Sequence, residues 1–172
     1  MEAVSLGSKA FRSMGPTRID KLEDIARKEI RKKEPPKPRR RVFLSFRGED
    51  LDLVNLFRGQ AKNENLDIDF IDFSLRVPFR SDNAQYIKRG IRERIRNCSV
   101  TIVLIGKTTY RSEWVDWEVR ESLKLGKGVI AVKLRDDSSI RTPPALVEHG
   151  IELLPWNLKI VNQAIQEAAE RR

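Results

Sequence analysis

The segment from Ser112 to Glu118 has the residue types and spacing in this chain that are best suited to chemistry. It reads SEWVDWE, and Trp114 and Glu118 lie four residues apart, a spacing that places both on one face of a helix. Glutamate on a helix is usually exposed to solvent, so an ordinary surface role for Glu118 stays open. The pattern nevertheless predicts a carboxylate site at this helix.

Other kinds of active site lack their residues. No GxGxxG motif follows the first predicted strand and no GxxxxGK[ST] motif occurs, which argues against a Rossmann dehydrogenase or a P-loop enzyme. A phospho-receiver domain needs an acidic pair at the position where Ser45, Phe46 and Arg47 stand. The single histidine, His149, lies in a late loop and the single cysteine, Cys98, precedes a strand, so we interpret both as structural and predict no metal site.

The elements that must position Glu118 follow an alternating pattern from residue 42 onward. Apolar runs of strand length alternate with longer segments of helical period, which is typical of βαβ units and a parallel sheet. The predicted strands are Val42–Phe46, Ile68–Phe73, Ser99–Ile105, Val129–Leu134 and a short one near Ile151–Leu154.

Helical periods fill the segments between these strands. The first helix has Leu51, Val54, Leu56, Phe57 and Ala61 as its apolar positions. A second helix spans about Asn83–Arg96, a third is opened by Ser112, and a C-terminal helix begins at about Leu158.

This order predicts an α/β fold with a flavodoxin-like, open and mostly parallel five-stranded sheet of order 2-1-3-4-5 and helices on both faces. The nearly continuous apolar run from Ser99 to Ile105 predicts a central strand, and Asp69 and Asp72 predict that the second strand lies near an edge. Ligands bind such sheets beyond the strand C-termini. Three loops should therefore meet at the site: Ser45–Asp50, Asp72–Asp82 and Gly106–Trp114.

A basic arm precedes this domain. Residues 1–41 hold 13 Lys/Arg against 6 Asp/Glu, whereas the rest of the chain holds 21 against 19, so most of the net charge of +9 belongs to the arm. A helical period begins at Pro16, and the prolines at 35, 36 and 38 predict a stiff linker. We therefore divide the chain into an arm, residues 1–41, and a domain, residues 42–172.

Charge and hydropathy also bear on partners. The arm has a single aromatic residue, Phe11, and the basic helix at residues 88–96 has none, so any nucleic-acid binding should be nonspecific. No apolar run reaches the roughly 20 residues of a membrane span, no signal peptide is evident, and a lone cysteine suits a reducing compartment. We expect a cytoplasmic protein, with self-association through the domain or through the arm helix.

Taken together, these residues resemble a TIR domain, and specifically the stand-alone bacterial TIR proteins of Thoeris anti-phage defence. The resemblance rests on four features in order: Val42-Phe43-Leu44-Ser45-Phe46, the strand from Ile68 to Phe73, the central strand before Gly106, and Ser112-x-Trp114-x-x-x-Glu118. It covers residues 42–134 well and the C-terminal part loosely, while the arm lies outside it.

The resemblance implies an NAD-cleaving enzyme. It implies that Glu118 is catalytic and that Trp114, one helical turn earlier, flanks the bound nucleotide. Ser45, Phe46, Arg47 and Asp72 are the further substrate-binding candidates, with Phe46 as a stacking wall. Arg47 follows the first strand at the crevice and could bind the pyrophosphate or equally be a solvated surface arginine. Asp72 could bind a ribose or equally cap the long loop that follows it. NAD is then the substrate, and no cofactor is required.

The product implied is a cyclic ADP-ribose signal, or another ADP-ribose derivative, that activates a separate effector. Two other function classes stay open at this point. Many TIR domains are non-catalytic scaffolds that act by assembling with other TIR domains, although the presence of both Trp114 and Glu118 argues against this. Nucleic-acid binding through the arm is the third class.

Overall fold

The computed structural model describes residues 22–23, 39–64, 66–72 and 78–170. The chain divides into two units, residues 1–37 and residues 38–172. Of the helix predicted in the arm, only Leu22 and Glu23 are described, and both are helical. The rest of that prediction, and the proline linker, lie outside the described residues.

Five strands of the described chain form one parallel sheet in the order β2-β1-β3-β4-β5, as the sequence predicts. The central strand β3 is buried at every position, which explains its continuous apolar run, and β2 lies at an edge. The strands are β1 (Arg40–Ser45), β2 (Ile68–Asp72), β3 (Val100–Ile105), β4 (Gly128–Lys133) and β5 (Leu153–Leu154).

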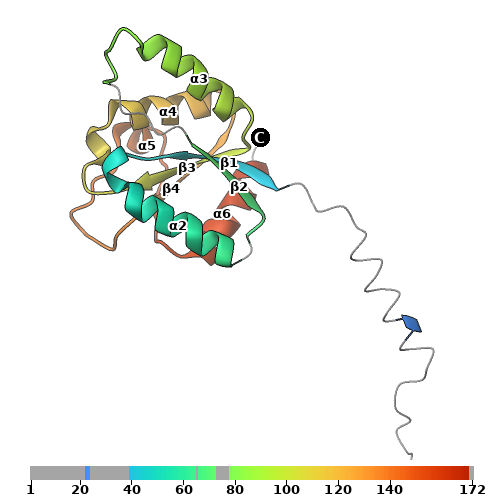
Figure 1. Ribbon diagram of the computed structural model, residues 1–172. Helices are drawn as coiled ribbons and strands as arrows, with labels where there is room; N and C mark the ends of the chain where they lie inside the picture. Colours follow the sequence, from blue (N-terminus) through green and yellow to red (C-terminus); the bar gives the residue numbers. More distant parts are fainter. Residues whose placement is uncertain (1–21, 24–38, 65, 73–77, 171–172) are drawn as a thin grey trace, which may run out of the picture. The chain divides into compact units, whose positions relative to one another are not determined.

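Helices cover both faces of the sheet (Figure 1). On one face, α2 and α6 pack on Val42, Leu44 and Ile102 in a single apolar cluster. On the other face, α3, α4 and α5 pack on the alternate strand residues. The helices are α2 (Leu51–Asn63), α3 (Ala84–Arg96), α4 (Glu113–Lys124), α5 (Pro144–Glu148) and α6 (Leu158–Glu170), with 3₁₀ turns η1 (Gly48–Asp50) and η2 (Thr109–Arg111).

The structure corrects the predicted elements at two places. Leu56, which we assigned to the apolar face of α2, is 53% exposed, because the neighbouring Phe57 takes the position that faces the sheet. The short helix α5 was not predicted, since it has five residues and begins at the second of two consecutive prolines, Pro143 and Pro144. The fifth strand is confirmed, but it pairs with β4 at only two residues, Leu153 and Leu154.

Candidate active site

Ser45 and Glu118 meet under helix α4. Because alternate residues of a strand point to opposite faces, Ser45 lies on the same face of β1 as Phe43, the face that α3 and α4 cover. The Ser45 hydroxyl donates a hydrogen bond to Oε2 of Glu118 over 2.5 Å. Ser45 has no exposed surface and Glu118 is 5% exposed, so this contact lies inside the protein.

Local signals at both ends of α4 fix where Glu118 lies. At the N-terminus the Ser112 side chain caps the helix and accepts a hydrogen bond from the backbone N–H of Val115 over 3.3 Å. At the C-terminus Gly126 has a φ of +66°, and the N–H groups of Gly126 and Lys127 donate to the carbonyls of Leu123 and Ser122. This is a Schellman ending, which favours glycine at the left-handed position.

A polar seam holds α4 against the sheet. The Ser122 hydroxyl donates to the backbone carbonyl of Glu118 over 2.7 Å and lies 2.8 Å from the hydroxyl of Thr101 on β3. Glu121, also buried, pairs with Arg92 of α3. The inner side of α4 is therefore positioned by directed hydrogen bonds as well as by apolar packing, which sets the rotation of the helix that carries Glu118.

Burial governs the ionisation of Glu118. Loss of solvent raises the pKa of Glu118 from 4.5 to about 8, and the hydrogen bond from Ser45 opposes this rise. A carboxyl group in this environment is largely protonated at neutral pH and ionises readily when a positive charge comes near. Such strongly shifted groups in a cleft are typical of functional sites.

Glu118 forms the inner end of a cleft of about 330 Å³ beyond the C-terminal end of β1. Trp114 lies one turn earlier on α4, and its ring meets that of Phe79 edge to face at 4.8 Å between centroids. The lining residues are Phe46, Arg47, Gly48, Glu49, Pro78, Phe79, Arg111, Ser112, Glu113, Trp114 and Glu118. A buried carboxyl group thus faces a cleft with aromatic walls.

Two loops at the end of the sheet are tied together beside this cleft. Arg47 donates to the backbone carbonyl of Thr108 over 3.0 Å and pairs with Glu49 at 3.3 Å. Thr109 accepts a hydrogen bond from the N–H of Gly106 and donates to Asp50, while a Cβ at Gly106 would collide with the Asp50 carboxylate. The first loop can approach β3 this closely because position 106 is glycine.

The structure brings most of the predicted site residues together. Phe46, Arg47, Trp114 and Glu118 all line the cleft, and Ser45 lies behind Glu118 as its hydrogen-bond donor. Asp72 is not among the lining residues, and its carboxylate pairs with Arg58 of α2. A ribose contact by Asp72 therefore stays a prediction.

Seven of the eleven lining residues were not among the predicted site residues, and Phe79, Arg111 and Glu113 are three of them. Phe79 and Arg111 lie in two of the three loops that the strand order directs to the site. Loop residues have no regular spacing from which the direction of their side chains could be predicted. Glu113 opens α4 and pairs with Arg80 at 2.8 Å. The sequence shows only that these three residues lie near the ends of loops that reach the site. It does not show which of the side chains there face the cleft.

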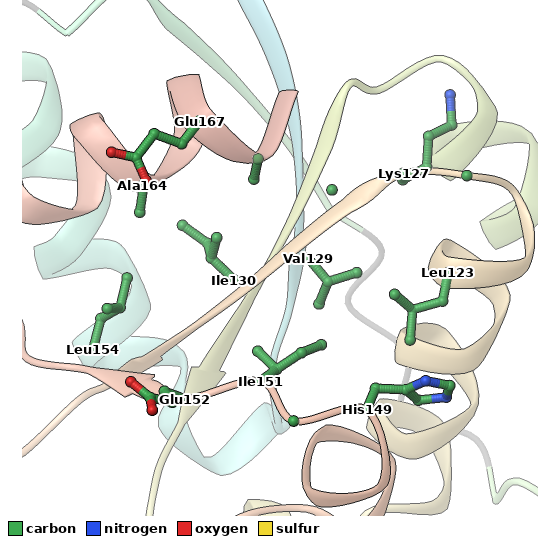
Figure 2. Close-up of a pocket in the computed structure, with 14 residues that line it drawn as sticks. Leu123, Lys127, Val129, Ile130, His149, Ile151, Glu152, Leu154, Ala164 and Glu167 are labelled. Carbon is green, nitrogen blue, oxygen red and sulfur yellow. The ribbon is translucent and has the colours of Figure 1, made fainter. Parts of the chain in front are cut away.

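A larger cavity lies elsewhere in the described part of the chain, beside the first residues of β4 (Figure 2). It has a volume of about 840 Å³ and shares no lining residue with the Glu118 cleft. In Figure 2, His149, Glu152, Glu167 and Lys127 stand at separate corners around an apolar centre that includes Val129 and Ile151. These polar groups do not converge on a common point, so we place the candidate active site at Glu118 despite the smaller volume there.

Neither a metal site nor a membrane-spanning helix is found in the described part of the chain. No group of three or more His, Cys, Asp or Glu residues there is arranged to hold a metal ion. None of the described helices has the length and apolar character needed to cross a bilayer. Cys98 is buried, and burial raises the pKa of its thiol to about 11, consistent with the predicted structural role.

Comparisons with known proteins find a curated relative of similar sequence. A protein of Bacillus cereus (strain MSX-D12) named "Putative cyclic ADP-D-ribose synthase ThsB1" is 32% identical over 99 residues, which are 55% of this chain and 52% of the relative. This chain thus matches about half the length of that relative.

Solved structures with a similar course of the backbone include two from TIR proteins. The TIR domain of the Toll-related receptor TRR-2 from Hydra magnipapillata is 17% identical, with a TM-score of 0.47 over 76% of this chain and 94% of that chain. The TIR domains of the activated Roq1 resistosome are 20% identical, with a TM-score of 0.42 over 77% and 85%.

The family comparison covers more than half of the chain. The family model described as "Thoeris protein ThsB, TIR-like domain" matches residues 43–139, which run from β1 past the end of β4 and include Ser45, Trp114 and Glu118. On this match, the chain belongs to the family of TIR-like domains of the Thoeris protein ThsB.

Proposed function

We propose that this protein cleaves NAD at the bond between nicotinamide and ribose, with Glu118 as its catalytic residue. The observation that carries the proposal is a glutamate that is 5% exposed and yet forms the inner end of a cleft, with Trp114 one turn before it. Membership of the ThsB TIR-like family and the name of the Bacillus cereus relative support the same class of activity.

A single carboxylate is sufficient for this reaction. Ordinary glycoside hydrolysis uses two carboxyl groups, because the leaving oxygen must be protonated as its bond breaks. The nicotinamide of NAD already carries a positive charge and leaves as a neutral ring, so it needs no proton donor. Glu118 would stabilise the positive charge that develops on the ribose, and this effect is strong where water is excluded.

The raised pKa of Glu118 fits this role. Before substrate binds, burial favours the neutral carboxyl group. The cationic nicotinamide ring entering beside Glu118 lowers its pKa, since an opposite charge at short range favours the ionised form. Ser45 then donates its hydrogen bond to a full carboxylate and holds that group in position for the ribose.

The second half of the reaction decides the product. Once the bond to nicotinamide is broken, ribose C1′ forms a new bond either to a water oxygen or to a nucleophilic atom of the same ADP-ribose, and the attacking group loses its proton. We propose that Phe46, Phe79 and Trp114, which line the cleft, cover the reacting ribose once the substrate is bound and so favour cyclisation over attack by water. We propose that the cyclic product is a signal to a separate effector in anti-phage defence, made in the cytoplasm with no further cofactor.

The proposal is tested by mass spectrometry of NAD incubated with wild-type protein and with the Glu118→Gln variant. The proteins are assayed in lysates of phage-infected and uninfected cells, because a defence enzyme can be inactive until it is triggered. We expect nicotinamide and an ADP-ribose species with wild type, and a rate at least 100-fold lower with Glu118→Gln, about 2.7 kcal/mol of transition-state stabilisation.

A matched control is Glu152→Gln, which neutralises an exposed glutamate that lines the other cavity. It should retain the wild-type rate. The mass and retention time of the product distinguish cyclic from linear ADP-ribose. If neither wild type nor the control consumes NAD in any lysate, the enzyme reading is wrong and a scaffold role through protein assembly takes its place.

A further inference from the structure

The Glu118 cleft adjoins a second cavity across the N-terminus of α4. The second cavity has a volume of about 340 Å³ and is lined by Tyr110, Trp117, Arg120 and Pro144, among others. The two cavities share Phe79, Arg111, Ser112 and Glu113 as lining residues. They are therefore neighbours on one surface, and Arg111 is the positively charged side chain common to both.

Size gives a reason to consider both cavities together. The Glu118 cleft, at about 330 Å³, lies at the lower end of the 300–1,000 Å³ range that small-ligand pockets occupy. A dinucleotide such as NAD consists of two nucleotides joined by a pyrophosphate. A cleft of this size suits one of those halves, so the other half requires a further surface beside it.

Two guanidinium groups lie against Tyr110 at this second cavity. The guanidinium carbon of Arg111 is 5.1 Å from the centre of the Tyr110 ring, and that of Arg141 is 5.3 Å away. Among the described residues, neither guanidinium pairs with a carboxylate, and their hydrogen-bonding edges remain available. Arginine held in this way is suited to bidentate binding of phosphate.

The acidic residues of the second cavity are already engaged. Glu113 accepts hydrogen bonds from Arg80, at 2.8 Å for the shorter contact. Asp116 accepts from Arg120 and from the backbone N–H of Ala145, both at 2.8 Å. These pairings neutralise the carboxylates locally, which leaves the charge of Arg111 and Arg141 uncompensated next to the Tyr110 ring.

We infer that the second cavity binds the adenosine half of the dinucleotide and that Arg111 binds the pyrophosphate that bridges the two cavities. This inference rests on the proposed function, because it takes the nicotinamide riboside half to lie in the Glu118 cleft. Tyr110 and Trp117 line the second cavity with ring surface for the adenine, and Arg141, which lies against the Tyr110 ring but is not a lining residue, adds positive charge nearby. Arg111 is thus a specificity-determining residue, which selects dinucleotides over nicotinamide riboside.

The test uses ligand binding to the full chain with the Glu118→Gln substitution, so that turnover does not interfere. The dissociation constants of ADP-ribose and of nicotinamide riboside are measured by isothermal titration calorimetry, with and without the additional substitution Arg111→Ala. We expect Arg111→Ala to weaken ADP-ribose at least tenfold and to change nicotinamide riboside less than twofold. Arg89→Ala, which removes an exposed arginine of α3 that lines neither cavity, should change neither constant.

Two further measurements complete the test. Tyr110→Ala should weaken ADP-ribose while Tyr110→Phe should not, because the ring and not the hydroxyl makes the contact. ADP-ribose should also bind at least tenfold more tightly than inorganic pyrophosphate, which carries the phosphates without the adenosine. Equal affinity for the two would overturn the adenosine site, and so would the absence of ADP-ribose binding or an equal loss of both ligands in Arg111→Ala.

Failure of this inference can be separated from failure of the proposed function. If wild type cleaves NAD and Arg111→Ala leaves its KM unchanged, the second cavity is not a subsite although the enzyme reading stands. If no NAD is cleaved but ADP-ribose binding depends on Arg111 and Tyr110, the subsite stands and the proposed reaction is wrong.

Discussion

Burial of Glu118 connects its ionisation to the stability of the fold. In the folded protein the pKa of this carboxyl is about 8, against 4.5 for a solvent-exposed glutamate, because desolvation disfavours the charge. Between these two values the folded chain keeps a proton that the unfolded chain has released. The contribution of Glu118 to stability is therefore fully present below pH 4.5 and is lost as the pH rises toward 8.

The loss of this contribution with rising pH leads to a prediction for the stability of Glu118→Gln. Glutamine cannot ionise, so the variant should gain stability relative to wild type by about 1.4 kcal/mol for each pH unit in the window from 4.5 to 8. The measurement is urea unfolding of both proteins at pH 5, 6.5 and 8. Taking the difference between the two proteins removes the effect of other groups, such as Asp50, whose pKa is also raised by burial. A difference that stays constant with pH would mean that Glu118 is ionised in the resting protein.

Helix α6 and strand β4 approach each other unusually closely at Gly128. A Cβ at this position would meet the backbone carbonyl of Ala168, which cannot rotate away as a side chain can. Gly59, inside α2, has nothing within 4 Å of the position of its missing Cβ. A side chain at position 128 is therefore excluded by the packing of α6 on β4, whereas position 59 has room for one.

We predict that Gly128→Ala destabilises the fold by about 1–3 kcal/mol, the usual cost of overpacking. Gly59→Ala should instead stabilise it by about 0.5–1 kcal/mol, because alanine favours the helix more than glycine does. Thermal unfolding of the two variants beside wild type measures both effects. Equal stability of the two variants would show that α6 can move away from β4 at little cost.

Elements with a strong local signal could be predicted from the sequence. The apolar run from Val100 to Ile105 predicts a central buried strand, and Ser112 predicts the start of α4; both are confirmed. The helix α5 could not be found, because five residues are too short for a helical period to appear. The exposure of Leu56 likewise depends on the rotation of α2, which tertiary packing sets.

Some features of the candidate site could likewise be predicted from the sequence, and others could not. The strand order directs the loops after β1 and β3 to one edge of the sheet, so the closeness of Phe46, Arg47, Trp114 and Glu118 follows from topology. The contact between Ser45 and Glu118 does not follow, because it depends on the rotation of α4 above β1. The arginine stacking on Tyr110 depends on the turn η2, for which the sequence has no recognisable signal.

At the scale of the whole molecule, the charge is distributed unevenly between the two units. Residues 1–37 hold 10 Lys/Arg and 6 Asp/Glu, so removing them lowers the net charge from +9 to +5. The three apolar clusters found among the described residues draw their members from Val42 onward. The second unit therefore has a core of its own, as a domain that folds independently requires.

We predict that deletion of residues 1–37 leaves a cooperatively folding domain with the cleft intact. Differential scanning calorimetry should give a single transition within about 4 °C of the full-length midpoint, a difference of no more than about 1 kcal/mol. Loss of the cooperative transition would show that the first unit contributes to the core. Sedimentation velocity of both forms at low and high salt then assigns self-association, since an assembly that depends on the basic arm disappears with the deletion, whereas one made by the domain remains.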